Sequence, residues 1–253
     1  MNKCPVVFHI PHASRHVPLE LRNTLLLSDA DLESELIRMT DSYTDELFDL
    51  TESVASRIVF PVSRLIVDPE RFVDDAQEVM SAKGMGVVYT RTSDGRTLRR
   101  DLTPDERNAL IRRYYDPHHE RLARAVQDVL GESSECLVLD SHSFPSVPLP
   151  YEFDQSFLRP DICIGTDEYH TPDWLSELAV TLFRGKGLWV EQNWPFSGAL
   201  VPLDHYRRTP QVRALMIEVN RSLYMDEITG TRSGRFSAFR NVLEAVLQQI
   251  IRV

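Results

Sequence analysis

Residues 5–10 read PVVFHI and are followed at once by PHAS at 11–14, a junction that indicates the class of fold. The first six residues are apolar on both faces, which is typical of a strand covered on both sides. Pro11 ends this predicted strand. Four further short runs are similar: CLVLD at 136–140, DICIG at 161–165, GLWVE at 187–191 and LMIEV at 215–219.

Helical patterns separate these predicted strands. Apolar residues recur at helical spacing from Asp29 to Ser56, and further helices are predicted at 174–183 and 236–253. Residues 57–67 hold two short β-rich pieces, IVFPV and RLIV. Strands that alternate with helices predict an α/β fold with a mainly parallel sheet, covered on both faces, in one domain over residues 1–253.

One helix has a clear start. Residues 103–106 carry a capping box, Thr followed three residues later by Glu, with a proline in the first turn. This helix is expected to run to Tyr115, to break at Pro117 and to resume through Leu130. The histidines of the segment YYDPHH (114–119) either cap the broken helix or reach a functional site.

Composition narrows the classes of function. Lys and Arg number 28 against 38 Asp and Glu, which gives a net charge of −10 and a pI near 5.3. An acidic chain argues against general binding of nucleic acids and against attachment to anionic membranes. No apolar run approaches the roughly 20 residues of a membrane span. The expected partner is therefore a small molecule.

The start of the chain and its cysteines indicate a compartment. The segment MNKCPVVFHIPH is strand-like and lacks the apolar region and cleavage site of a signal peptide. The three cysteines are widely spaced and fit neither a disulfide framework nor a CxxC metal site. We expect a protein of the reducing cytoplasm.

Polar side chains lie where the predicted strands end. His12 follows the first strand, His142 follows the second, and Glu218 lies within the fifth. In parallel sheets, ligands bind outside the carboxyl ends of the strands. Histidine is the commonest metal ligand, and a catalytic zinc ion takes three protein ligands and keeps an open position. We therefore expect a metal site at this edge of the sheet.

The third ligand is expected to be a carboxylate. The helix after His12 offers Asp41 and Asp45 one turn apart, although Asp41 could instead be an N-cap. Glu218 interrupts an apolar strand, where an unpaired charge is costly. It is either a general base near the metal or the partner of Arg221 in a buried salt bridge.

Arginines near the strand ends suit a substrate that bears carboxylates. Only three of the 28 cationic residues are lysines, and arginine is the better bidentate partner of a carboxylate. Arg64, Asp68 and Arg71 lie around one strand end, Arg221 follows the fifth strand, and Asn193 follows the fourth. Amino-acid composition and solvation of the surface are the alternative explanation, and hold for most of the arginines.

Seven stretches, in this order, together resemble the N-formylglutamate amidohydrolase family: HIPHAS (9–14), TDSYTDELF (40–48), SRLIVDPERF (63–72), YYDPHHERL (114–122), VLDSHSFPS (138–146), NWPFSGALV (193–201) and MIEVNRSLYMD (216–226). They span about nine tenths of the chain. The resemblance implies a three-layer α/β/α fold of the phosphorylase/hydrolase type, similar to zinc carboxypeptidases. It also implies hydrolysis of N-formylglutamate to formate and glutamate, with one zinc ion per chain, in histidine degradation.

The resemblance also implies roles for single residues. His12 and His142 correspond to zinc ligands, Asp41 is the expected carboxylate ligand, and Asp45 is its alternative. Glu218 corresponds to the general base of carboxypeptidase-like sites. The residues expected to bind the substrate carboxylates are Arg64, Asn193 and Arg221.

Three positions depart from the family pattern. Ala13–Ser14 replaces the usual small glycine, Pro69–Glu70 stands where many relatives carry an asparagine before the arginine, and His118 stands where a tyrosine is common. These changes keep the expected metal ligands but leave the substrate open. The alternatives are another N-acyl amino acid, a peptidoglycan-like amide, or non-catalytic binding of an acidic metabolite.

Overall fold

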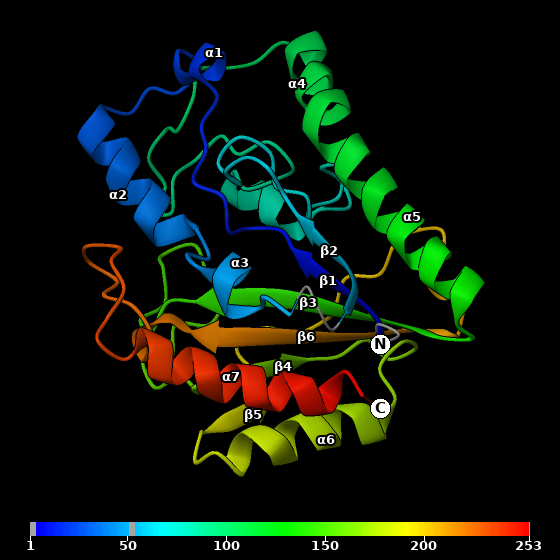
Figure 1. The fold of residues 1–253 in the computed structure, drawn as a ribbon. Helices are drawn as coiled ribbons and strands as arrows, with labels where there is room; N and C mark the ends of the chain where they lie inside the picture. The colour runs from blue at the N-terminus through cyan, green and yellow to red at the C-terminus, as the bar shows by residue number, and fades with distance from the viewer. Residues whose placement is uncertain (1–3, 51–53, 253) are drawn as a thin grey trace.

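The computed structural model describes residues 4–50 and 54–252. Within them the central element is a six-stranded sheet with the order β2-β1-β3-β6-β4-β5 (Figure 1). Neighbouring strands are parallel except β4 and β6, which are antiparallel. The strands are β1 (Cys4–Ile10), β2 (Val54–Val59), β3 (Cys136–Phe144), β4 (Ile162–Gly165), β5 (Val190–Gln192) and β6 (Val212–Asn220).

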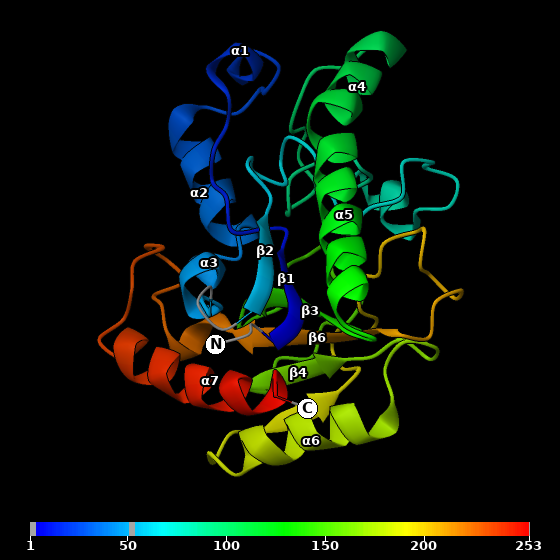
Figure 2. The ribbon, with the colours of Figure 1, turned by 45° about the vertical axis from the view of Figure 1, so that its right-hand side comes forward.

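Helices cover both faces of this sheet, as the sequence predicts for a three-layer α/β/α fold. Helix α5 packs on β1, β2 and β3, whereas α6 and α7 pack together below the other face (Figures 1 and 2). The helices are α1 (Leu19–Arg22), α2 (Asp29–Met39), α3 (Thr44–Leu47), η1 (Val79–Lys83), α4 (Pro104–Leu110), η2 (Ile111–Tyr115), α5 (Asp116–Glu132), α6 (Asp173–Arg184), η3 (Arg221–Leu223) and α7 (Phe236–Ile250). No helix among the described residues has the length and apolar character needed to cross a bilayer.

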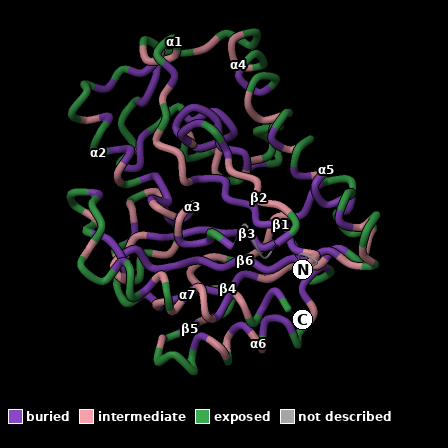
Figure 3. Tube along the Cα trace, viewed as in Figure 1, coloured by how far each residue is buried: buried purple, intermediate pink, exposed green. Residues whose placement is uncertain are grey.

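The inner strands β1, β3, β6 and β4 are buried on both sides because their side chains alternate between two cores. In β1, Val6, Phe8 and Ile10 belong to the core shared with α6 and α7. Val7 belongs to the core under α5. Burial of each large apolar side chain contributes roughly 1.5–3 kcal/mol. Figure 3 shows the traces of β3 and β6 as mostly buried, whereas most of the edge strand β2 is intermediate.

The helix predicted from Asp29 to Ser56 is wrong over its second half. Thr40 is extended, and Tyr43 has a left-handed backbone with φ of 68°, so the chain leaves the helical path after α2. Only the short α3 follows before β2 begins. Residues 51–53 of the predicted helix lie outside the described residues.

The capping box at Thr103 is confirmed, but the break at Pro117 is not. The Thr103 hydroxyl accepts from the Glu106 N–H, and the Glu106 carboxylate accepts from the Thr103 N–H. The helix then widens into one π-helical turn, η2, and continues as α5. Pro117 lies in the first turn of α5, where its missing N–H is tolerated.

A third apolar cluster supports the loops that reach the sheet edge. It joins α2 and α4 to the segment 60–98, and its fully buried members include Leu65, Ile66 and Val67. The predicted β-rich piece RLIV is therefore a buried turn rather than a strand. This turn carries the chain directly into Asp68 and the residues that follow it.

Candidate active site

The ends of β1 and β3 bring two buried histidines together. His12 lies two residues beyond β1, and His142 lies in β3 with its ring centroid 5.2 Å from that of His12. Glu218 of β6 is paired in register with His142. Parallel pairing of β1, β3 and β6 therefore gathers three of the predicted residues at one edge.

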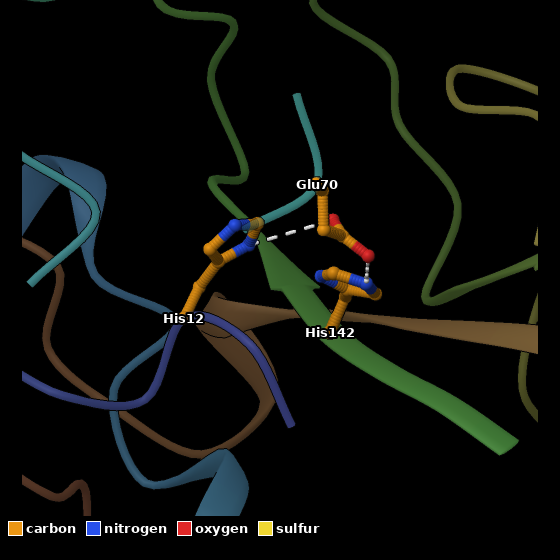
Figure 4. A group of neighbouring side chains, drawn as sticks. All are labelled: His12, Glu70 and His142. Carbon is orange, nitrogen blue, oxygen red and sulfur yellow. Dashed lines mark hydrogen bonds and ion pairs between the residues drawn. The ribbon is translucent and has the colours of Figure 1, made fainter. Parts of the chain in front are cut away.

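Two carboxylates face both histidines. Asp41 Oδ2 lies 3.1 Å from Nδ1 of His142 and 3.6 Å from Nδ1 of His12. Glu70 places Oε1 3.1 Å from Nε2 of His142 and Oε2 3.8 Å from Nδ1 of His12 (Figure 4). One ligand atom each from His12, Glu70 and His142 lie within 4.8 Å of one another. Asp45, the alternative to Asp41, lies on α3 and does not line this site.

His12 has a nitrogen free to bind a ligand. Its Nε2 is 2.8 Å from Oδ1 of Asp68, whereas its buried Nδ1 has no hydrogen-bond partner. Buried polar atoms are rarely left without a partner unless a missing group completes them. The free nitrogen faces Asp41 and Glu70, so it is aimed into the site.

Further buried side chains form hydrogen bonds with the residues of the site. Asp140 Oδ1 lies 3.0 Å from Nε2 of His142 and 2.8 Å from Nδ1 of His9. The Nε2 of His9 lies 2.9 Å from Nε2 of His118. His118 is therefore connected to the site through His9, while His119 contacts the carbonyl of residue 69. Carboxylates bound to metal-ligating imidazoles typically fix their orientation.

Despite burial, the surrounding carboxylates raise the pKa values of the two histidines and so favour positive charge in the site. Burial lowers the pKa of His142, but Glu70 and Asp140 raise it, and the net shift is well above the ordinary value. Burial also lowers the pKa of His12, but Asp68 contributes to a net upward shift. The site favours either protonated histidines or a bound cation.

Glu218 is the carboxyl group suited to proton transfer. It is buried, its Oε2 has no hydrogen-bond partner, and burial is the main cause that raises its pKa to about 8. The alternative salt bridge is not formed, because Arg221 donates instead to Oδ1 of Asp41 at 2.8 Å. A carboxyl group with this pKa exchanges protons near neutral pH.

A cavity of about 260 Å³ opens over these groups. His12, Asp41, Glu70, His142 and Glu218 all line it. Four arginines also line it: Arg38, Arg64, Arg71 and Arg221.

The arginines predicted to bind substrate line this cavity but are engaged by the protein. Arg64 donates to Asp68 Oδ2 at 2.8 Å. Arg221 donates to Asp41, and also to the hydroxyl and the carbonyl of Ser143. Both guanidiniums brace the carboxylates that surround the histidines.

Asn193 is not brought to the cavity. Its side chain accepts from the backbone N–H of Thr166 and donates to the Thr166 hydroxyl, at 2.9 and 2.8 Å. Its backbone is left-handed, with φ of 55°. The structure thus gives Asn193 a role in holding the turn after β5.

Glu70 is the residue that sequence reasoning missed. It lies in a loop with no periodic pattern, directly after a proline. One feature near it marks this loop: Asp68, two residues before Glu70, is a completely buried carboxylate. A buried carboxylate next to a second one points to a nearby cationic site.

Comparisons with known proteins identify the family of this chain. A family model described as N-formylglutamate amidohydrolase matches residues 4–225. The N-formylglutamate deformylase of Pseudomonas putida is 23% identical over 232 residues, which cover 89% of this chain and 84% of that protein.

Two solved structures share the fold. An N-formylglutamate amidohydrolase from Ralstonia eutropha JMP134 superposes with a TM-score of 0.84 at 23% identity, covering 100% of this chain and 94% of that one. A gene product of Agrobacterium tumefaciens gives 0.69 at 22% identity, covering 98% and 92%.

Proposed function

This chain belongs to the N-formylglutamate amidohydrolase family, and from that premise we propose that it hydrolyses N-formylglutamate to formate and glutamate in a metal-dependent reaction. The observation that carries the proposal is the meeting, in one cavity, of two buried histidines with a proton-accepting carboxyl group. His12 has a free nitrogen there, and Glu218 has a free oxygen.

Two of the three distances among the proposed donors fit a divalent cation. His12, Glu70 and His142 also form a group whose ligand atoms all lie within 4.8 Å of one another. Ligand atoms around a tetrahedral zinc ion with bonds of 2.0–2.1 Å lie roughly 3.3 Å apart. Asp41 Oδ2 lies 3.1 and 3.6 Å from the Nδ1 atoms of His142 and His12. We propose these three residues as the metal ligands and zinc as the metal, one ion per chain, with Glu70 as a further donor beside it.

The charge of the site fits as well. Four carboxylates lie around the two histidines, and in the described part of the chain arginines donate to only two of them: Arg64 donates to Asp68 and Arg221 to Asp41. Buried charge without compensation is costly. Glu70 and Asp140 form no ion pair with an arginine among the described residues, so a bound cation would compensate negative charge beside His142.

The chain's own residues then carry out the proton transfers. A divalent cation bound there supplies a Lewis acid, which lowers the pKa of water and polarises a carbonyl. Glu218 Oε2 takes a proton from the water that adds to the formyl carbon. The C–N bond breaks, and Glu218 returns the proton to the leaving nitrogen. Asp68 keeps His12 in place during these steps.

Two further parts of the proposal concern context. The resemblance to the family implies histidine degradation as the pathway. The cytoplasm is the proposed location, and the chemistry of the cysteines supports it, because Cys4, Cys136 and Cys163 are all unpaired.

A panel of N-acyl amino acids tests the proposed function. Purified protein loaded with zinc is assayed for released acid with N-formyl, N-acetyl and N-succinyl glutamate, and with N-formyl derivatives of other amino acids. We expect the highest kcat/KM for N-formylglutamate, loss of activity with a chelator, and recovery when zinc is added. Failure of the zinc-loaded protein to release formate from any of these compounds would overturn the proposal.

A further inference from the structure

Two of the four arginines in the cavity have no side-chain acceptor within the part of the chain that the structure describes. Arg64 donates to Asp68 through both Nε and NH2, and Arg221 donates to Asp41 and to Ser143. For Arg38 and Arg71, no acceptor among the described residues lies within hydrogen-bond distance of the guanidinium, although both line the cavity. Arg71 is partly buried, a setting in which guanidiniums normally find acceptors, whereas Arg38 is exposed. These two therefore have donors available for a ligand.

Arg71 lies at the inner end of the cavity. It follows Glu70 directly, and its Nε is buried without a partner. The nearest carboxylate oxygen, Asp68 Oδ2, is 3.7 Å away and already accepts from Arg64 and from the Tyr89 hydroxyl. Arg71 therefore lines the cavity with donors that have no acceptor within residues 4–50 and 54–252.

Arg38 lies nearer to solvent, on the last turn of α2, and its side chain is 43% exposed. Its backbone carbonyl accepts from Arg221, which ties this turn to the site. Its NH1 is 3.7 Å from Glu35 and 3.9 Å from Asp94, too far for hydrogen bonds. The Glu35 carboxylate accepts instead from Ser93. Arg38 is oriented by these charges and keeps its donors free.

We propose that Arg71 and Arg38 hold the two carboxylates of the substrate, in place of Arg64, Arg221 and Asn193. Arg71, next to the metal site, takes the α-carboxylate, which lies close to the scissile amide. Arg38, at the outer end, takes the side-chain carboxylate and sets the preference for an acidic side chain. A guanidinium whose N–H groups have no other acceptor suits a carboxylate, because it can donate two parallel hydrogen bonds to it. This inference rests on the proposed function.

Paired substrates separate the two roles. N-formylglutamine has the size of N-formylglutamate but carries an amide in place of the side-chain carboxylate. The measured quantity is the ratio of kcat/KM for N-formylglutamate to that for N-formylglutamine. In Arg38→Gln we expect this ratio to fall roughly tenfold to hundredfold, the scale of a lost charged hydrogen bond. In Arg71→Gln we expect kcat/KM to fall for both substrates while the ratio is kept.

The matched control is Arg112→Gln, which removes the same charge from an exposed position outside the cavity. It should leave both kcat/KM values and the ratio as in the unmodified protein. If kcat/KM falls equally for both substrates in a folded Arg38→Gln variant, the ratio is unchanged. Arg38 then does not recognise the side-chain carboxylate, and the inference is wrong.

A binding measurement keeps the inference testable without turnover. Calorimetry with glutarate, a dicarboxylate without an amide, is compared between the unmodified protein and both variants. Weaker binding in Arg38→Gln and Arg71→Gln supports the inference even if no N-formyl compound is hydrolysed, an outcome that would overturn only the proposed function. Equal glutarate affinity in all proteins would overturn the inference itself.

Discussion

Glu218 and His142 occupy paired positions on β6 and β3, so backbone hydrogen bonds of the sheet set their separation. This arrangement explains how a carboxyl group stays next to cationic groups without forming a salt bridge with them. Arg221, three residues further along the chain, is held by Asp41 and Ser143. The strand thus presents a carboxyl oxygen to the cavity with no competing partner.

Replacement of this carboxyl group should separate chemistry from metal binding. In Glu218→Gln we expect kcat for N-formylglutamate to fall roughly hundredfold to ten-thousandfold, the usual contribution of a general base. Zinc content should stay near one ion per chain, since the proposed ligands are untouched. The measurements are formate release and metal analysis, with the exposed Glu177→Gln as control. Turnover near that of the control would exclude Glu218 as the base.

The sequence predicted part of this site for a definite physical reason. His12, His142 and Glu218 follow or interrupt apolar strands, and parallel pairing brings such positions to one edge. Glu70 could not be predicted in this way, because it lies in a loop with no periodicity. Whether an arginine donates to a protein carboxylate depends on its neighbours in space. The sequence alone therefore does not distinguish Arg64, which is paired with Asp68, from Arg38, which has no such partner among the described residues.

Among the elements, the five strands predicted from apolar runs are present, whereas the strand at RLIV, the break at Pro117 and the continuation of the helix after α2 are not. The apolar spacing between Leu36 and Leu50 is compatible with a helix, yet a left-handed residue at Tyr43 turns the chain. This turn places Asp41, whose N–H donates to the carbonyl of His12, beside the histidines. Tertiary contacts at the site outweighed helical propensity there.

The start of α4 offers a test at the level of one element. Thr103→Ala removes one half of the capping box and should lower the free energy of unfolding by about 1 kcal/mol. The measurement is urea unfolding, with Thr181→Ala at an exposed position of α6 as control. The control should change stability by less than about 0.5 kcal/mol. An unchanged midpoint for Thr103→Ala would show that this cap does not stabilise the folded state.

Across the whole molecule, the proposed metal ligands join parts of the chain that are far apart in sequence. His12 follows β1, Asp41 follows α2 and His142 lies in β3. Unfolding separates these groups, so a metal that binds all three stabilises only the folded state. Thermal stability should therefore report on the site independently of catalysis.

Calorimetric melting with and without a chelator measures this effect. At zinc one hundred times above its Kd, we expect Tm to be higher than in the metal-free protein by roughly 5–10 °C. His142→Ala, which lacks one proposed ligand, should lose most of the zinc-dependent increase and should purify with little zinc. An equal increase in this variant, or none in the unmodified protein, would contradict the proposed ligand set.

The position of β6 has a consequence for how the protein is made. It lies between β3 and β4, yet it follows every other strand in the chain. Until the ribosome has released residues 212–220, β3 and β4 expose unpaired edges, which are sites of aggregation in incomplete chains. The same segment carries Glu218. Pairing of β6 with β3 and β4 therefore also brings the proposed base into the site. A nascent chain thus completes its sheet and gains its proposed base together, late in synthesis and before α7 covers the sheet.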